Sequence, residues 1–129
     1  MIVTAEDARR FAVRWAESWN NREIEPVLAH FDQNVVFTSP AAFVLLGVAT
    51  VHGNEELRAY WRVALSRIRS LHFKVDRVVW EPERREVAII YTSEVDGTTK
   101  RVSENLTFDQ AGCVVTGEVF HGVSGELEY

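Results

Sequence analysis

The sequence predicts a single α+β domain in which N-terminal helices pack on one face of a curved antiparallel β-sheet. Two segments in the first half carry apolar residues at the three-and-four spacing of an amphipathic helix. The second half contains segments rich in β-branched and aromatic residues, separated by short turn sequences. Short connections between strands require antiparallel pairing, and helices followed by a run of strands are typical of the α+β class.

The first predicted helix follows Thr4, which caps it together with Asp7 three residues later. Its end is expected at Asn20-Asn21, and a shorter helix is expected near Glu23–His30. The apolar face of the first helix is formed by Ala8, Phe11, Ala12, Trp15, Ala16 and Trp19.

A strand is expected at Val35–Ser39, and a second long helix runs from about Asn54, its expected cap, to Ser70. Between them the segment Ala41–Val51 is too apolar for an ordinary surface loop. We interpret it as a lid over a pocket or as a dimer contact.

Four strands complete the prediction, and Asp96-Gly97 between two of them is a strong hairpin signal. Both faces of the second strand are apolar, so the outer face of the sheet needs cover as well as the inner one. We expect a second copy of the chain to cover it, which predicts a homodimer; a mildly apolar but exposed face is the alternative. The four strands are Leu71–Trp80, Glu86–Val95, Thr99–Asp109 and Cys113–Gly122.

Composition limits the kind of protein. The 129 residues, 47% of them hydrophobic, suit one domain over residues 1–129 with one core. No stretch is long enough for a membrane span, and the first residues lack the features of a signal peptide, so we expect a cytoplasmic protein. The net charge of −5 argues against nucleic acid as a partner.

Metal and cofactor motifs are missing from the sequence. The single cysteine, Cys113, excludes an internal disulfide and cysteine-rich zinc motifs. His30, His52 and His72 are dispersed without metal-ligand spacing. Since phosphate-binding and dinucleotide-binding motifs are also missing, we expect neither a metal nor a cofactor.

Glu104 is the most informative polar residue. Alternation along Thr99–Asp109 places it on the apolar face beside Val102, directed to the core or to a pocket. Desolvation would raise its pKa, which makes it a candidate acid, base or hydrogen-bond donor to a substrate. The alternative is a structural carboxylate paired with an arginine or a tryptophan N–H group.

His121 follows the same logic on the last strand, where Val119 and Gly117 share its inward side. Gly117 would leave room for a pocket wall, and an inward histidine can carry protons near neutral pH. The alternative is a core histidine without a chemical role. Ser39 could donate a hydrogen bond to a ligand or be an ordinary turn serine.

Large aromatic side chains with polar groups lie on the apolar stripes of both long helices. Such residues form core, and they also line pockets for flat, lipophilic ligands. We predict a pocket for a small lipophilic molecule with Glu104 and His121 as catalytic residues. Its ligand-binding residues are predicted to be Trp15, Trp19, Ser39, Tyr60, Val102 and Val119.

The order of elements resembles the nuclear transport factor 2-like superfamily, and three phrases resemble its SnoaL-like branch. These are Trp19–Glu23 ending the first helix, His30–Phe37 entering the strand, and His52–Leu57 opening the second long helix. The resemblance implies a cystatin-like cone around an apolar pocket. It does not imply one reaction, because the superfamily hosts isomerases, cyclases, dehydratases, hydrolases and non-catalytic binders.

Steroid delta-isomerase is a member that allows a comparison by residue. By resemblance, its catalytic aspartate falls at Ser39 and its oxyanion-binding tyrosine at Trp15. Its protonated aspartate falls at Glu104, and aromatic wall positions fall at Tyr60 and near His121. Because the base is lost and the tyrosine replaced, the resemblance argues against steroid isomerisation.

Three functions remain open from the sequence. The first is a cofactor-independent acid/base enzyme, of isomerase, cyclase or lyase type, for a small lipophilic carbonyl or polyketide-like compound. The second is a non-catalytic small-molecule binding protein. The third is a dimerisation module whose cavity is filled by its own side chains.

Overall fold

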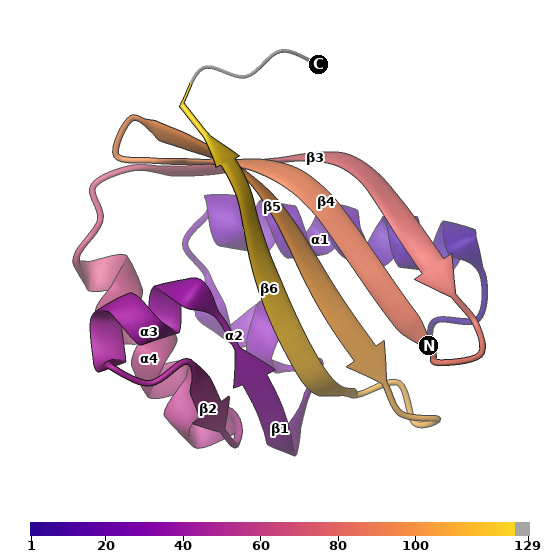
Figure 1. Ribbon diagram of the computed structural model, residues 1–129. Coiled ribbons are helices and arrows are strands. Elements are labelled where there is room, and N and C mark those ends of the chain that lie inside the picture. The colour runs from indigo at the N-terminus through magenta and orange to yellow at the C-terminus, as the bar shows by residue number, and fades with distance from the viewer. Residues whose placement is uncertain (126–129) are drawn as a thin grey trace.

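The computed structural model describes residues 1–125, which form one mixed helix-and-sheet structure (Figure 1). The helices are α1 (Ala5–Asn20), α2 (Ile24–Leu28), α3 (Pro40–Leu46) and α4 (Asn54–Ser66). The strands are β1 (Phe31–Thr38), β2 (Thr50–His52), β3 (Leu71–Glu81), β4 (Glu86–Val95), β5 (Thr98–Phe108) and β6 (Val114–Ser124). The predicted α+β class is confirmed.

The six strands form one sheet in the order β2-β1-β6-β5-β4-β3. Strands β3 to β6 make the predicted antiparallel meander, and Asp96 and Gly97 both adopt positive φ in the β4–β5 turn. The expectation of a wholly antiparallel sheet is wrong at β1, which pairs with β6 in parallel. The chain between β1 and β6 contains two helices and four strands, a connection long enough to permit parallel pairing.

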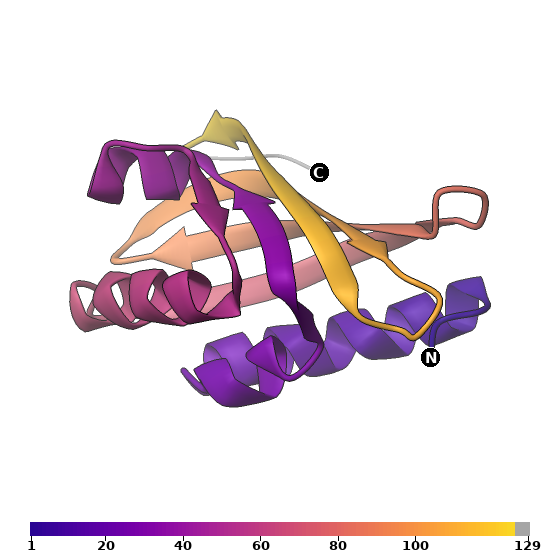
Figure 2. The ribbon, with the colours of Figure 1, turned by 90° about the horizontal axis from the view of Figure 1, so that it is seen from below.

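The sheet curves over the helices, as Figure 2 shows, so that its concave face and the helices enclose the core. Helix α1 packs mainly against β3, and α4 lies against β1 and β2. The apolar stripe of α1 is buried as predicted, and Thr4 with Asp7 forms the predicted capping box. None of the helices within residues 1–125 is long and apolar enough to cross a bilayer.

Two side chains at the end of α1 tie the helices to the sheet. The Asn20 amide donates to the carbonyl of Phe73 at 3.0 Å and accepts from its N–H at 2.7 Å. Arg22, with φ of 59°, donates to the last carbonyls of α4 at Leu65 (2.6 Å) and to Ile68 (3.0 Å). These bonds fix the distance between α1, α4 and β3, which determines the space left between them.

The segment interpreted as a lid or a dimer contact contains the helix α3 and the start of β2. Ser39 caps α3 through a bond from the Ala41 N–H, Pro40 occupies its first turn, and Gly47 ends it in the left-handed conformation. These cap signals were present in the sequence, and the apolar run between them obscured the helix. The second long helix also ends at Ser66 instead of Ser70, and its cap is Gly53 instead of Asn54.

The outer face of the sheet carries the predicted apolar residues among polar ones. Val79 and Phe120 are exposed, and Ala88 and Ile90 are partly buried between them. Paired residues place Val79 beside Ala88 and connect Ile90 to Phe120 through Ser103. The homodimer remains a prediction.

Candidate functional site

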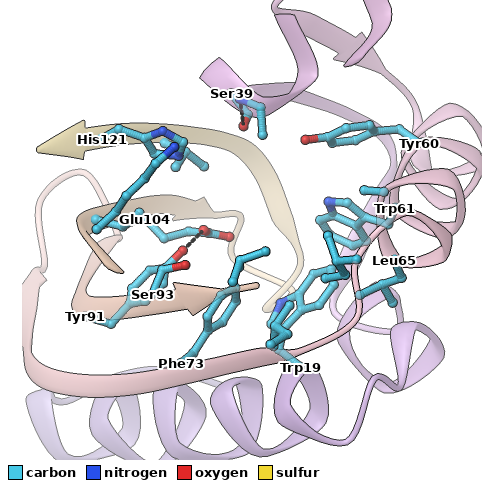
Figure 3. A pocket seen from close by; sticks show the side chains of 18 of the residues that line it. Trp19, Ser39, Tyr60, Trp61, Leu65, Phe73, Tyr91, Ser93, Glu104 and His121 are labelled. Atoms are coloured by element: carbon cyan, nitrogen blue, oxygen red, sulfur yellow. Dashed lines mark hydrogen bonds between the residues drawn. The ribbon is translucent and has the colours of Figure 1, made fainter. Parts of the chain in front are cut away.

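A cavity of about 410 Å³ lies between the concave face of the sheet and the helices α1 and α4 (Figure 3). Its volume is in the range typical of small-molecule sites. Its walls are largely aromatic and aliphatic. The residues predicted for the site that line it are Trp19, Ser39, Tyr60, Val102, Glu104, Val119 and His121.

The burial of side chains along β5 shows which end of the cavity is open. Thr98 is exposed and Lys100 is partly buried, whereas Val102 and Glu104 are buried. All four belong to the inner face of the strand and line the cavity. The mouth therefore lies at the β4–β5 turn, and Glu104 lies at the inner end.

Glu104 is buried in this apolar space, with 5% of its surface exposed. Burial raises the pKa of its carboxyl from 4.5 to about 7, and a hydrogen bond from Tyr91 opposes the rise. The Tyr91 hydroxyl donates to Glu104 Oε1 at 3.2 Å (Figure 3). Burial is the main cause that holds the pKa of Tyr91 well above 10, and the charge of Glu104 is the second. Tyr91 therefore keeps its proton and remains a donor.

The second oxygen of Glu104, Oε2, receives no hydrogen bond from residues 1–125. It is therefore available to a ligand or to water in the cavity. Tyr60 and Ser39 line the same space, and their hydroxyl groups point into it (Figure 3). Burial raises the pKa of Tyr60, hydrogen bonding with Ser39 opposes this, and the nearby Glu104 charge adds to it.

His121 lies on the mouth side of Glu104. It is paired with Val102, whereas Glu104 is paired with Val119, so Glu104 and His121 are diagonal neighbours on one face of the sheet. Such neighbours are about 7–8 Å apart, a gap that a small substrate group can span. His121 is exposed, and the partial burial of its ring, with a contribution from the Lys100 charge, lowers its pKa below 6.5.

The two tryptophans of α1 have different positions. Trp19 lines the cavity and packs edge-on against Trp61, with ring centroids 4.9 Å apart. Trp15 does not line this cavity: it stacks behind Phe73 and contacts Tyr91 edge-on, and it borders a smaller hollow at α2. The indole N–H groups of Trp15 and Trp19 are both buried without a hydrogen-bond partner among the described residues.

Sequence reasoning missed two features of the site. The space beside Gly117 is filled by the Phe37 ring, which would lie 2.6 Å from an added Cβ, so the glycine serves packing instead of leaving the pocket open. Lys100 lines the mouth, and the alternation that selected Glu104 also places Lys100 on the inner face. Within residues 1–125 no group of three or more His, Cys, Asp or Glu side chains could hold a metal ion.

The family model for the SnoaL-like domain matches residues 12–117 of this sequence. The match covers most of the chain, which therefore belongs to the SnoaL-like domain family, within the nuclear transport factor 2-like superfamily. A comparison with curated proteins found no significant match.

Solved structures share the fold over nearly the whole chain. A SnoaL-like protein of unknown function from Burkholderia thailandensis is 26% identical with a TM-score of 0.84, covering 95% of this chain and all of its own. An epoxide hydrolase/cyclase-like enzyme of pyran ring formation in salinomycin, SalBIII, is 13% identical with a TM-score of 0.73, covering 92% of each chain. A steroid delta-isomerase from Pseudomonas aeruginosa is 17% identical with a TM-score of 0.67, covering 90% of this chain and 80% of its own.

Proposed function

We propose that this protein is a cofactor-independent acid/base enzyme acting on a small lipophilic carbonyl compound, of isomerase, cyclase or lyase type. The observation that carries the proposal is a buried carboxyl group with a pKa of about 7 at the inner end of an apolar cavity. A group with this pKa is present in both protonation states at neutral pH, which suits proton transfer in either direction. His121, with a pKa lowered from 6.5, supplies an unprotonated imidazole on the same face.

The proposed step is an enolisation. The protonated Glu104 donates its proton to the carbonyl oxygen, while the neutral imidazole of His121 takes the proton from the carbon beside the carbonyl. The electron pair of the broken C–H bond forms the C=C bond of the enol. If the enol is conjugated with a second C=C bond, His121 returns its proton to the far carbon of that system while the Glu104 carboxylate takes back the enol proton, which gives an isomer. If the next carbon carries a leaving group, the Glu104 carboxylate takes back the enol proton, the group departs with the electron pair of its bond and receives the proton of His121, which gives a lyase reaction.

The surroundings of Glu104 suit this step. The apolar walls exclude water and select a lipophilic substrate, and the Tyr91 hydrogen bond stabilises the carboxylate that forms when the proton leaves. The hydroxyl groups of Ser39 and Tyr60 are placed to hold a substrate oxygen. The similarity to SalBIII and to the steroid delta-isomerase supports an enzymatic use of the fold, without specifying the reaction.

Deuterium exchange on 2-tetralone in D₂O, followed by proton NMR at neutral pH, tests the proposal without knowledge of the natural substrate. We expect the protein to accelerate exchange at the carbons beside the carbonyl. Glu104→Gln should lower this acceleration by a factor of about 100 or more, because it removes the proton carrier. Glu118→Gln, on the outer face of β6, is the matched control and should exchange as the wild type does. Equal exchange by Glu104→Gln and wild type would refute the role of Glu104.

A non-catalytic binding protein is the second candidate. It is favoured by Glu104 Oε2, which accepts no hydrogen bond from residues 1–125 and shares the cavity with Ser39 and Tyr60. These groups can satisfy a ligand hydroxyl without any chemical change. Native mass spectrometry of the purified protein, followed by extraction of bound small molecules, separates the two functions. A tightly held, unaltered ligand, together with no exchange on a ketone that binds, would favour the binding protein.

We also propose that the outer face of the sheet forms a homodimer, because its apolar residues around Ile90 and Phe120 need cover. Sedimentation velocity at micromolar concentration tests this proposal, and a monomer would contradict it. A pure dimerisation module is less well supported, because the cavity of about 410 Å³ is not filled by the protein's own side chains.

A further inference from the structure

The charges that line the cavity lie at its two ends. Among the described lining residues, Glu104 and Lys100 are the carboxylate and the ammonium group, and both project from the inner face of β5. Glu104 is buried at the inner end, whereas Lys100 is partly buried at the mouth. Their positions are four residue steps apart along the strand, so their Cα atoms are about 13 Å apart.

Among residues 1–125, the ammonium group of Lys100 has no carboxylate as a partner. No ion pair joins it to any side chain within residues 1–125, and Glu104 is too far along the strand to pair with it. Asp96 lies in the turn at this end, but its Oδ1 accepts from the backbone N–H groups of Arg69 at 2.7 Å and Ser70 at 2.9 Å. Glu94 is on the outward side of β4, opposite His72 on β3.

Lys100 is a positive charge in a protein that is negatively charged overall. The chain carries a net charge of −5 and only two lysines, and the other one, Lys74, is exposed on the outer side of β3. The overall field therefore repels anions, and a preference for an anionic ligand must come from the mouth itself.

We propose that the ligand of this cavity is an organic monoanion, a lipophilic carboxylate whose charged group binds Lys100 at the mouth. Its apolar body fills the aromatic part of the cavity, and its oxygen-bearing reactive end reaches Glu104. The contact of the reactive end with Glu104 rests on the proposed function. The contact of the charged group with Lys100 does not depend on that function. His121 lines the cavity between these two residues, since it is paired with Val102, which lies between Lys100 and Glu104 on β5.

Two dyes that differ by one anionic group test the proposal. N-phenyl-1-naphthylamine is neutral, and 8-anilinonaphthalene-1-sulfonate adds a sulfonate to the same ring system. Fluorescence titrations at low ionic strength give the dissociation constant of each dye for the wild type, Lys100→Met and Lys74→Met. Methionine keeps the apolar stem of the lysine and removes its charge.

We expect the anionic dye to bind the wild type more tightly than the neutral dye, and Lys100→Met to weaken the anionic dye about tenfold. The neutral dye should bind Lys100→Met as it binds the wild type, which also shows that the cavity is intact. Lys74→Met should leave both dyes unaffected. Decanoate should displace the neutral dye at lower concentration than decan-1-ol, with a difference that shrinks in high salt.

Equal effects of Lys100→Met and Lys74→Met on the anionic dye would overturn the proposal, as would equal displacement by decanoate and decan-1-ol. Neither result would affect the acid/base function of Glu104, which the deuterium exchange measures separately. Failure of both dyes to bind would instead contradict the cavity as a ligand site, and both proposals with it.

Discussion

The burial of Glu104 makes a quantitative prediction about stability and pH. Folding raises the pKa of this carboxyl from 4.5 to about 7, so the folded protein holds the proton more tightly than the unfolded chain does. Below pH 4.5 the group is protonated in both states and contributes nothing to the free energy of unfolding. As the pH rises, the unfolded state gains from ionisation first, so the folded state loses stability until the pH exceeds about 7.

The size of the loss follows from the two pKa values. One pKa unit corresponds to about 1.4 kcal/mol, so a pKa raised from 4.5 to about 7 amounts to about 3 kcal/mol at high pH. The substitution Glu104→Gln removes the ionisation and keeps an oxygen that accepts the Tyr91 hydrogen bond. We therefore expect Glu104→Gln to be about 3 kcal/mol more stable than the wild type above about pH 8, and equally stable near about pH 4.

Urea unfolding of both proteins at a series of pH values, followed by tryptophan fluorescence, measures this difference. Groups that titrate in both proteins cancel in the comparison, so the pH dependence of the difference belongs to Glu104. Glu118→Gln, which removes an exposed carboxylate from the outer face, controls for the change in net charge. A difference between wild type and Glu104→Gln that is constant across the pH range would refute the argument.

Two further substitutions test the packing and the electrostatics of the site. Gly117→Ala places a methyl group 2.6 Å from the Phe37 ring. We therefore expect a loss of about 1–3 kcal/mol in unfolding free energy and weaker dye binding. Unchanged thermal unfolding would contradict this and show that the ring can move aside. Tyr91→Phe removes the hydrogen bond that lowers the pKa of Glu104, so that pKa should rise above its present value of about 7. Carbon-13 NMR of the glutamate carboxyl measures it, and an unchanged or lower value would contradict the assigned hydrogen bond.

Local patterns predicted most of the elements because they act within a few residues. The capping box at Thr4, the apolar stripe of α1 and the Asp96-Gly97 turn each need only their sequence neighbours. The helix α3 was missed, although its caps are equally local, because an apolar run in a short segment fits several structures. The parallel pairing of β1 with β6 could not be predicted, since it depends on where the chain returns after α4 and the meander.

The residues of the site also differ in how far local patterns could predict them. Alternation along β5 placed Glu104 inward, and alternation along β6 gave His121 the same face, because a strand has a period of two. The apolar stripe of α1 contained Trp15 and Trp19 equally, yet only Trp19 lines the cavity. The difference depends on how α1 is rotated and held against β3, which the stripe does not specify.

The sequence by itself determined the class of fold, the inward direction of Glu104 and the apolar character of the pocket, because each depends on periodicity and residue type. Only the tertiary structure decided that Glu104 and His121 are neighbours, that Phe37 fills the space beside Gly117, and that Lys100 lines the mouth without an ion-pair partner in residues 1–125. These are contacts between segments far apart in the chain. They are set by strand register and by packing distances between elements, which no local pattern contains.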